Sequence, residues 1–474
     1  MKHAMTDMPE ALAAAQRHAV AFLEGVDNRP VAATATLDQL RARLDVELAP
    51  DGVAPKQVID DLVAATDGGH LGSAGGRFFG WVIGGALPAA LAADWLVSTW
   101  DNNAVVYACG PASAVVEEVA GAWVKDILGL PSEASFAFTT GCQMAHVTCL
   151  AAARHALLRD RGWDVERRGL AAAPPITVLA TEQHHGSIER ALRLLGMGTD
   201  CLVALATEAN GRLAAPTLRA ALAEVKGPTI VILDAGDLNI AAIDPFAELI
   251  PLARSAGAWV HVDGAFGLWA RASARHRGKL WGIERAHSWA TDAHKWLNTP
   301  KDIGVAVVAD RDAHRAAMSV TAAYIVASGD ARDEMDWTPD WTRRARGFPV
   351  YAALRQLGRR GIEAMIDGCC QHAEALSLGI GQLDGAELVA RPTLNQGLVR
   401  FLDPRSAATD VDHDSFTERV VSAINAEGTA LFSGGAWRGR RVMRISVVNA
   451  RTSVEDVKLT IRAVAKVLGR LHGE

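Results

Sequence analysis

The chain has 474 residues, which is too long for one simple core and typical of two or three packed domains. Half of the residues are apolar and 22% are charged, the balance of an ordinary globular protein. The net charge of −6 favours neither nucleic acid nor an anionic membrane as a partner. No apolar run is long enough to span a membrane, and residues 1–10 lack the apolar core of a secretory signal.

The six cysteines show no spacing typical of a zinc site, so the sequence predicts no metal. Two of them are adjacent in sequence and would seldom form a disulfide with each other. Together these features favour a reduced protein of the cytoplasm. The cysteines are Cys109, Cys142, Cys149, Cys201, Cys369 and Cys370.

The N-terminal segment, residues 1–85, is predicted to be mainly helical. Apolar residues recur at three- and four-residue spacing within 9–48, notably in 15–23 and 37–48. A segment this apolar ahead of the main domain needs a cover, and a partner subunit would provide it. Residues 68–85 are rich in glycine and read as a loop that either lines a pocket or serves as a linker. We therefore predict an N-terminal helical dimerisation segment.

Residues 86–347 are predicted to form a large α/β domain. Helical patterns cover 86–100 and 113–127, and from Phe136 onward short apolar strands alternate with helices. Such alternation indicates a mostly parallel sheet with helices on both faces. The predicted strands are 136–140, 175–181, 229–234, two that end at Asp263 and Lys295, and 303–309. The predicted helices between them are 143–159, 187–195 and 246–255.

Beyond Asp310 the pattern changes. Residues 327–340 are polar and acidic without periodicity, and predict a mobile loop. The segment 348–474 is predicted to form a small C-terminal α+β domain. It contains a helical pattern at 348–370, strands at 398–402 and 442–448, and a closing helix at 454–471.

Residues 258–296 hold the groups best suited to chemistry. Two short apolar strands there end in polar residues, one at Asp263 and the other at His294 and Lys295. An open α/β sheet binds ligands at the carboxyl ends of its strands, so these groups would face one crevice. Pyridoxal phosphate needs a lysine amine and an acid that keeps its ring nitrogen protonated. The alternative is a structural ion pair between Asp263 and Lys295, with His261 and His294 as packed core histidines.

Three further segments offer candidate groups. Gly141-Cys142-Gln143 ends a strand and opens a helix, where backbone N–H groups can bind a phosphate. In His184-His185, an imidazole could stack on a flat ring and transfer protons, or one histidine could cap the helix while the other faces solvent. Arg444 could bind a substrate carboxylate with its two-pronged guanidinium, or could simply lie on the surface.

The chain resembles the group II pyridoxal-phosphate-dependent decarboxylases, the family of aromatic amino acid, histidine, glutamate and tyrosine decarboxylases. The motifs His261-Val262-Asp263-Gly264-Ala265, Asp292-Ala293-His294-Lys295-Trp296-Leu297-Asn298 and Gln183-His184-His185 carry the resemblance. Weaker matches extend it over about 77–449, in family order. The resemblance implies the fold-type I architecture, with a mostly parallel seven-stranded sheet in the large domain. It also implies an intertwined homodimer with active sites at the interface.

The resemblance also assigns roles to individual residues. Lys295 forms the Schiff base with pyridoxal 5'-phosphate, Asp263 pairs with the ring nitrogen, and His185 stacks on the ring. Ala265 packs beneath the ring, where a bulkier side chain would intrude. The phosphate is held by Gly141, Cys142, Gln143 and His294.

The chain departs from the family pattern at three places. Gly141-Cys142-Gln143 replaces Gly-Gly-Ser at the phosphate, and Gly236-Asp237-Leu238 replaces Gly-Thr-Thr near the ring. The loop 327–340 contains no tyrosine, although in well-studied animal decarboxylases a loop tyrosine returns a proton to the substrate carbon. Tyr324 lies at the edge of this loop but aligns better with another family position. His185 could serve as the replacement acid.

The leading hypothesis is a cytoplasmic lyase that acts in amino acid metabolism, and therefore in carboxylic acid metabolism. It would convert an L-amino acid into a primary amine and carbon dioxide. An aromatic amino acid is a candidate substrate. The runner-up is a relative that uses the same cofactor as an aldehyde synthase, a carbon–carbon lyase or an aminotransferase. A third hypothesis is a cofactor-binding protein that has lost catalysis.

Overall fold

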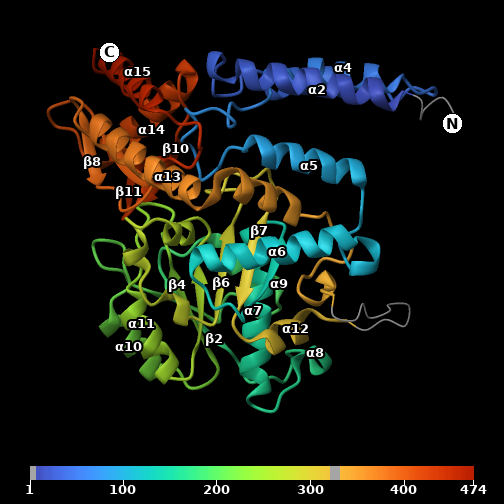
Figure 1. Cartoon of the computed structure of the whole chain (residues 1–474). Helices are drawn as coiled ribbons and strands as arrows, with labels where there is room; N and C mark the ends of the chain where they lie inside the picture. Colours follow the sequence, from blue (N-terminus) through green and yellow to red (C-terminus); the bar gives the residue numbers. More distant parts are fainter. Residues whose placement is uncertain (1–6, 321–330, 474) are drawn as a thin grey trace. The chain divides into compact units, whose positions relative to one another are not determined.

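The computed structural model describes residues 7–320 and 331–473, which divide into two compact units (Figure 1). The larger unit comprises 82–374 and 390–397, and the smaller comprises 7–81, 375–389 and 398–473. The smaller unit therefore joins both ends of the chain: the N–H of Phe79 donates to the carbonyl of Leu431 at 2.8 Å. The domain boundaries predicted after residues 85 and 347 stay predictions.

The larger unit is built on a seven-stranded sheet in the order β1-β7-β6-β5-β4-β2-β3. Strands β3, β2, β4, β5 and β6 pair in parallel, whereas β7 runs antiparallel to both β6 and β1. This confirms the predicted α/β fold with a mostly parallel seven-stranded sheet. The strands are β1 (Ser135–Thr139), β2 (Thr177–Thr181), β3 (Leu202–Leu205), β4 (Thr229–Asp234), β5 (Trp259–Asp263), β6 (Ser288–Asp292) and β7 (Gly304–Val308).

The central strands are buried along their whole length. Every residue of β1, β4, β5, β6 and β7 is buried, which requires helices on both faces of the sheet. Their sequences are accordingly almost continuous apolar runs rather than alternating ones. The edge strand β3 is short and half exposed, and the sequence analysis missed it.

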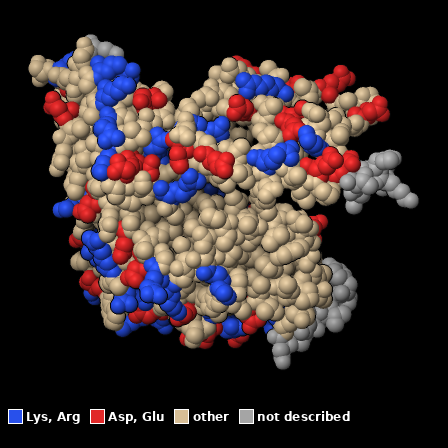
Figure 2. All heavy atoms as spheres, turned by 45° about the horizontal axis from the view of Figure 1, so that its top comes forward, with Lys and Arg blue, Asp and Glu red and all other residues tan. Residues whose placement is uncertain are grey.

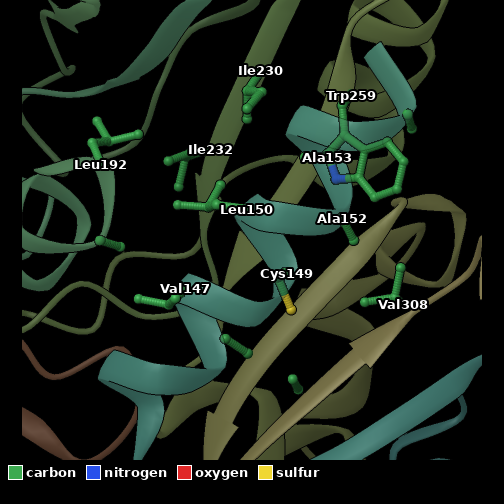
Figure 3. Close-up of a cluster of buried hydrophobic side chains, with 14 of the residues drawn as sticks. Val147, Cys149, Leu150, Ala152, Ala153, Leu192, Ile230, Ile232, Trp259 and Val308 are labelled. Atoms are coloured by element: carbon green, nitrogen blue, oxygen red, sulfur yellow. The ribbon is translucent and has the colours of Figure 1, made fainter. Parts of the chain in front are cut away.

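Helix α7 (Cys142–Arg159) packs directly on this sheet. It contacts β1, β5, β6 and β7 and is buried around most of its circumference, so its sequence is apolar rather than amphipathic. Figure 3 shows Leu150 of α7 in one cluster with Ile230 and Ile232 of β4 and Leu192 of α9 (Gly186–Leu194). Each such side chain stabilises the fold by about 1.5–3 kcal/mol through burial. The core therefore fixes the start of α7 against the ends of β5 and β6.

The other helices of the larger unit surround the sheet. They are α5 (Pro88–Trp100), α6 (Pro111–Leu128), α8 (Val165–Arg168), α9 (Gly186–Leu194), α10 (Ala215–Glu224), α11 (Phe246–Ser255) and α12 (Arg311–Met318). Helix α13 (Gly347–Gly381) bends at Gly358, whose φ of +59° is not helical. Short 3-10 turns are η2 (Tyr107–Cys109), η3 (Gly267–Ala272), η4 (Arg277–Leu280), η5 (Ile283–Arg285) and η6 (Glu334–Asp336).

The smaller unit combines helices with a four-stranded sheet of order β10-β11-β9-β8. Three of its helices begin with complete capping boxes, which satisfy orphan N–H groups of the first turn. Its helices are α2 (Met8–Gly25), α3 (Leu37–Leu44), α4 (Pro55–Thr66), α14 (Asp410–Glu427) and α15 (Val454–His472), with η1 (Val26–Asn28) after α2. Its strands are β8 (Ala386–Ala390), β9 (Gln396–Phe401), β10 (Ser433–Trp437) and β11 (Arg440–Ser446).

Two sequence predictions need correction. The helical segment 9–48 is two helices, α2 and α3, separated by η1 and irregular backbone. The strand predicted to reach Lys295 ends at Asp292. Part of the predicted loop 327–340 lies outside the described residues, and its described part contains the turn η6. Within the described ranges, no helix combines the length and apolar composition needed to cross a membrane.

Candidate active site

Two neighbouring strands of the large sheet each end in a buried aspartate. Strand β5 ends at Asp263 and β6 at Asp292, and the two strands pair in parallel with Asp263 opposite Ala290. Because parallel strands end at the same edge of a sheet, both carboxylates lie at one edge. Both are more than nine-tenths buried.

Lys295 lies in the turn after β6 rather than in the strand. The N–H of Ala293 donates to the carbonyl of Ile303 at 3.0 Å, and His294 Nδ1 lies 2.9 Å from the same carbonyl oxygen. This turn brings Lys295 Nζ to 3.0 Å from Asp292 Oδ2. The alternative of a direct Asp263–Lys295 ion pair is therefore wrong, since the carboxylate partner of Lys295 is Asp292.

The backbone around Lys295 is crowded by the predicted glycine-rich loop. A Cβ atom on Gly84 would collide with the carbonyl oxygen of Lys295, so only glycine fits there. The N–H of Gly85 donates to Asn298 Oδ1 at 3.1 Å. The loop therefore crosses directly over the backbone of Lys295, and whether it lines a pocket stays a prediction.

Charge keeps the Lys295 ammonium protonated. Burial acts to lower its pKa, but the charges of Asp292 and Asp263 and the hydrogen bond to Asp292 outweigh burial and raise the pKa above the ordinary value. The Cys142 thiol lies among the same groups. Burial, followed by the charge of Asp292, raises the pKa of Cys142 well above its usual range. Cys142 is therefore a neutral thiol beside the lysine.

Asp263 is held in its anionic form. Burial acts to raise its pKa, but His146, Lys295 and His185 outweigh burial and place the pKa below the ordinary value. Its Oδ1 accepts the N–H of Ala265 at 3.1 Å, and its Oδ2 lies 3.4 Å from His146 Nε2. A carboxylate has about four lone-pair positions, so capacity for another donor remains.

His146 is a site residue that the sequence analysis missed. It lies on α7, fully buried, with Nδ1 at 2.9 Å from His261 Nε2 and Nε2 at 3.4 Å from Cys142 Sγ. A histidine inside an apolar helix carries no local signal of its partner. Ligand atoms of Cys142, His146 and Asp263 lie within 4.8 Å of one another, and their contacts account for this spacing without a metal ion.

The start of α7 contains three of the residues that were predicted to hold the phosphate. Gly141 has a φ of +94°, which turns the chain from β1 into the helix. The N–H of Cys142 donates to Asp292 Oδ1 at 2.6 Å, and Gln143 Nε2 donates to the carbonyl of Ser187 at 3.1 Å. A Cβ on Gly141 would lie 3.4 Å from His294 Cε1. The structure thus brings together three of the predicted phosphate ligands and His294.

The two neighbouring histidines have different surroundings. His185 caps α9, with its Nδ1 accepting the N–H of Ser187 at 3.2 Å, so the proton of the neutral ring is on Nε2. His184 lies 2.7 Å from the carbonyl of Thr181 and 3.1 Å from Glu189 Oε1. His185 therefore caps the helix, as the alternative interpretation predicted, but His184 does not face solvent, because its side chain is only 12% exposed.

Gly236-Asp237-Leu238 replaces the family's Gly-Thr-Thr, and the structure explains part of this replacement. The Asp237 carboxylate is buried and accepts N–H groups from Asn239, Ile240 and Ala242 at 2.8–3.1 Å. It therefore holds the turn after β4 rather than offering a charge to a ligand. Leu238 is half-buried in the same turn.

Two other residues named in the sequence analysis are Arg444 and Tyr324. Arg444 belongs to β11 of the smaller unit and is buried, which excludes a plain surface role; its role in substrate binding stays a prediction. Tyr324 lies outside the described residues. The described part of the predicted loop, 331–340, contains no tyrosine.

The groups at this sheet edge fit one cofactor. A lysine, a buried anionic carboxylate and the N-terminus of a long helix match the aldehyde, ring nitrogen and phosphate of pyridoxal phosphate. The fold and the site thus define a pyridoxal-phosphate-dependent enzyme of the α/β class.

Comparison with known proteins identifies the family. The pyridoxal-dependent decarboxylase conserved domain matches residues 47–402, and the chain belongs to this family. An L-2,4-diaminobutyrate decarboxylase of Rhizobium meliloti (strain 1021) is 30% identical over 397 residues, 82% of this chain and 76% of the relative. An aromatic-L-amino-acid decarboxylase of Bacillus atrophaeus is 27% identical over 457 residues, 93% of this chain and 91% of the relative. A crystal structure of Oryza sativa TDC with PLP and tryptamine has the same fold, with a TM-score of 0.92 at 23% identity over 98% of both chains.

The chain is therefore a carboxy-lyase that uses pyridoxal phosphate to decarboxylate an L-amino acid. This confirms the predicted family, cofactor and reaction.

Proposed function

We propose that Lys295 carries pyridoxal phosphate and that Asp263 binds the protonated nitrogen of its ring. When bound, the ring supplies a sink for the electron pair left at the substrate carbon as carbon dioxide departs. The observation that carries the proposal is the position of a buried lysine and a buried anionic carboxylate at the ends of neighbouring strands. An anionic Asp263 favours a cationic partner, which is the form of the ring that attracts electrons.

Asp292 has a distinct role in this proposal. Lys295 must lose a proton before its amine joins the cofactor aldehyde, and Asp292 Oδ2 is 3.0 Å from Nζ. This carboxylate can take that proton, and it holds the side chain in place beforehand. It also accepts the Cys142 N–H, which orients the start of α7.

Gly141, Cys142, Gln143 and His294 would hold the phosphate. The proposal is supported by the position of these residues at and beside the N-terminus of α7, where the helix dipole favours an anion. Burial lowers the pKa of His294, so its ring is neutral and contributes as a hydrogen-bonding group rather than as a cation.

His185 and Ala265 would border the ring. His185 would stack on one face, and its Nε2 proton could be returned to the substrate carbon after carbon dioxide leaves. Ala265, whose N–H is bonded to Asp263 Oδ1, presents only a methyl group, so it leaves room beneath the ring.

A panel of L-amino acids tests the reaction. We expect the purified holoenzyme to release carbon dioxide and a primary amine in equal amounts, without ammonia or aldehyde. Lys295→Ala should abolish the visible absorbance of the covalently bound cofactor and lower activity on the order of a thousandfold or more. Ammonia and aldehyde without amine would instead favour an aldehyde synthase, and an absorbance change without any product would favour a non-catalytic protein.

For the substrate, we propose an aromatic L-amino acid. The relative that spans nine-tenths of both chains is named an aromatic-L-amino-acid decarboxylase, which supports this choice. L-2,4-diaminobutyrate is the alternative, because the more identical relative is named for that substrate. Comparing kcat/KM for both substrates in the same preparation decides between them.

We also propose a homodimer. Large apolar side chains are exposed on several helices, and Figure 2 shows a broad surface area with few charged side chains. The exposed residues include Leu12 and Val20 of α2, Val58 and Leu62 of α4, and Trp95, Leu96 and Trp100 of α5. Sedimentation equilibrium should give twice the mass of one chain; a monomer at micromolar concentration would refute the proposal.

A cytoplasmic location completes the proposal. All six cysteines are free thiols, and four of them are buried, as expected of a protein kept in a reducing compartment. Fractionation of the native cells, followed by detection of the protein in each fraction, tests this.

A further inference from the structure

A line of buried polar side chains extends from Asp263 into the sheet. His146 Nε2 lies 3.4 Å from Asp263 Oδ2, and His146 Nδ1 lies 2.9 Å from His261 Nε2. His261 Nδ1 in turn lies 2.9 Å from Ser288 Oγ, which accepts the indole N–H of Trp259 at 2.9 Å. The line therefore joins helix α7 to strands β5 and β6.

Burial makes these contacts necessary. The side chains of His146, His261 and Ser288 are fully buried, and Trp259 is 5% exposed. A buried polar group without a hydrogen-bond partner is costly, so each member depends on the next. The two imidazole rings meet edge to face, at 81° and 5.2 Å between centroids, which aims a nitrogen of one ring at the other.

The two ends of the line set the direction of every hydrogen bond. The indole N–H of Trp259 can only donate, and the Asp263 carboxylate can only accept. Burial lowers the pKa of His261 to about 3, so this ring is neutral at any working pH. The contacts satisfy all groups if Ser288 donates to His261, His261 donates to His146, and His146 donates to Asp263.

We infer that His146 is a positioning residue for Asp263, supported from behind by His261 and Ser288. Its N–H stabilises the carboxylate charge at Oδ2, while the Ala265 N–H does the same at Oδ1. The remaining lone pairs are then directed to the cofactor ring nitrogen. Without His146, Asp263 becomes more basic and draws the shared proton away from the ring. This inference rests on the proposed role of Asp263.

The other titratable groups nearby leave this arrangement intact. Cys142 Sγ, 3.4 Å from His146 Nε2, is a neutral thiol because burial raises its pKa. Lys295 and His185 contribute by charge alone, and both lower the pKa of Asp263. The donor to Oδ2 is therefore His146 itself.

The experiment compares His146→Leu and His146→Gln with the wild-type holoenzyme. The leucine removes the donor, whereas the glutamine keeps an N–H near the Nε2 position. Cofactor dissociation constants are measured by equilibrium dialysis, and the protonation of the ring nitrogen is measured by NMR with 15N-labelled pyridoxal phosphate. We expect His146→Leu to raise the dissociation constant about tenfold to a hundredfold and to move the ring-nitrogen signal toward the unprotonated position. His146→Gln should restore both toward wild type.

Two further variants make the test specific. Ser288→Ala, at the far end of the line, should weaken cofactor binding about threefold in the same direction. His314→Leu removes another fully buried histidine, whose nitrogens lie 2.9 Å from Ser135 Oγ and the Trp337 carbonyl. It should lower thermal stability without moving the ring-nitrogen signal. If His146→Leu does not fold, the glutamine and Ser288→Ala variants carry the test.

Asp263→Asn separates failure of this inference from failure of the proposed site. If Asp263→Asn alters the ring-nitrogen signal while His146→Leu and Ser288→Ala leave it and the dissociation constant unchanged, the role of His146 is refuted and that of Asp263 stands. If Asp263→Asn also leaves the signal unchanged, the proposed role of Asp263 is itself wrong.

Discussion

Asp263 and Glu334 are both buried carboxyl groups of the larger unit, yet their pKa values depart in opposite directions. Burial raises the pKa of Glu334 to about 8. The charge of Arg332 lowers this pKa but does not cancel the effect of burial, and the nearby carboxylate of Glu117 raises it further. At Asp263 the surrounding donors and cations outweigh burial, and the pKa is lowered.

The difference lies in how each neighbourhood uses its cations. Around Glu334, the guanidinium of Arg343 is bonded to both oxygens of Glu117, at 2.9 and 3.0 Å, and to the carbonyls of Ala104 and Phe138. Arg343 therefore binds Glu117 and backbone carbonyls, and although Arg332 donates to Glu334 Oε1 at 2.8 Å, burial outweighs its charge. Around Asp263, no cation is bonded to the carboxylate, while two N–H groups approach it and Lys295 and His185 act at a distance.

A buried carboxyl group is therefore a candidate for binding a cationic ligand when its anionic form is stabilised but its hydrogen-bonding capacity is not exhausted. Asp263 meets this condition. Glu334, whose neutral form is favoured, does not. Four substitutions test this distinction.

The largest expected effect is on catalysis at Asp263. Asp263→Asn keeps the shape but removes the charge, so the cationic ring loses its partner, and kcat should fall by about a hundredfold to a thousandfold. Steady-state kinetics on the preferred substrate measure this. Glu334→Gln is the matched control, the same carboxyl-to-amide change at a buried site, and should keep near-wild-type kcat. Equal losses in both variants would contradict the distinction.

A large effect on stability is expected at Glu117. Glu117→Gln leaves the Arg343 guanidinium buried without its counter-charge, and both side chains are fully buried. Breaking such a pair costs about 3–5 kcal/mol in the free energy of unfolding. Urea denaturation measures the loss. The folded fraction should bind the cofactor as tightly as wild type, whereas a weaker affinity would connect this cluster to the site.

The pH dependence of stability sharpens the comparison. The unfolded Glu334 carboxyl ionises near 4.5 and the folded one near 8, so the folded protein holds one more proton between these values. This contribution to stability therefore falls as pH rises from about 4.5 to 8. Glutamine cannot titrate, so Glu334→Gln should become progressively more stable relative to wild type as pH rises from about 4.5 to 8, and gain nothing below pH 4.5. Unfolding curves at both pH values measure this; a pH-independent difference would contradict it.

The smallest effect is expected at an exposed carboxylate. Hydrogen bonds from Thr409 and from Arg405 lower the pKa of Asp412 to about 2, in the same direction as at Asp263. Asp412 is exposed to solvent, so salt screens its interactions. Asp412→Asn should leave activity unchanged and shift the unfolding midpoint by less than can be resolved at physiological salt. A clear loss of thermal stability would contradict this, because it would mean that the direction of a pKa shift alone predicts how much a carboxylate contributes to stability.

The sequence by itself determined the elements with strong local signals. Continuous apolar runs identified β4, β5 and β7, and strand–helix alternation predicted the parallel sheet. The lysine and the aspartate were correctly placed near strand ends, because polar residues that follow a buried strand emerge at the edge of the sheet. Short or half-exposed elements such as β3 and β10 were missed, since their apolar pattern is weak.

Only the tertiary structure decided the partners of the charged groups. His146 and His261 are separated by 115 positions in sequence, and Cys142 and Asp292 by 150, yet each pair is hydrogen-bonded. A side chain carries no local sign of a neighbour so distant along the chain. Packing of α7 across the sheet creates these contacts, and with them the charge state of Asp263. Local sequence can thus reveal which chemical groups are present, whereas their protonation depends on distant residues that folding brings into contact.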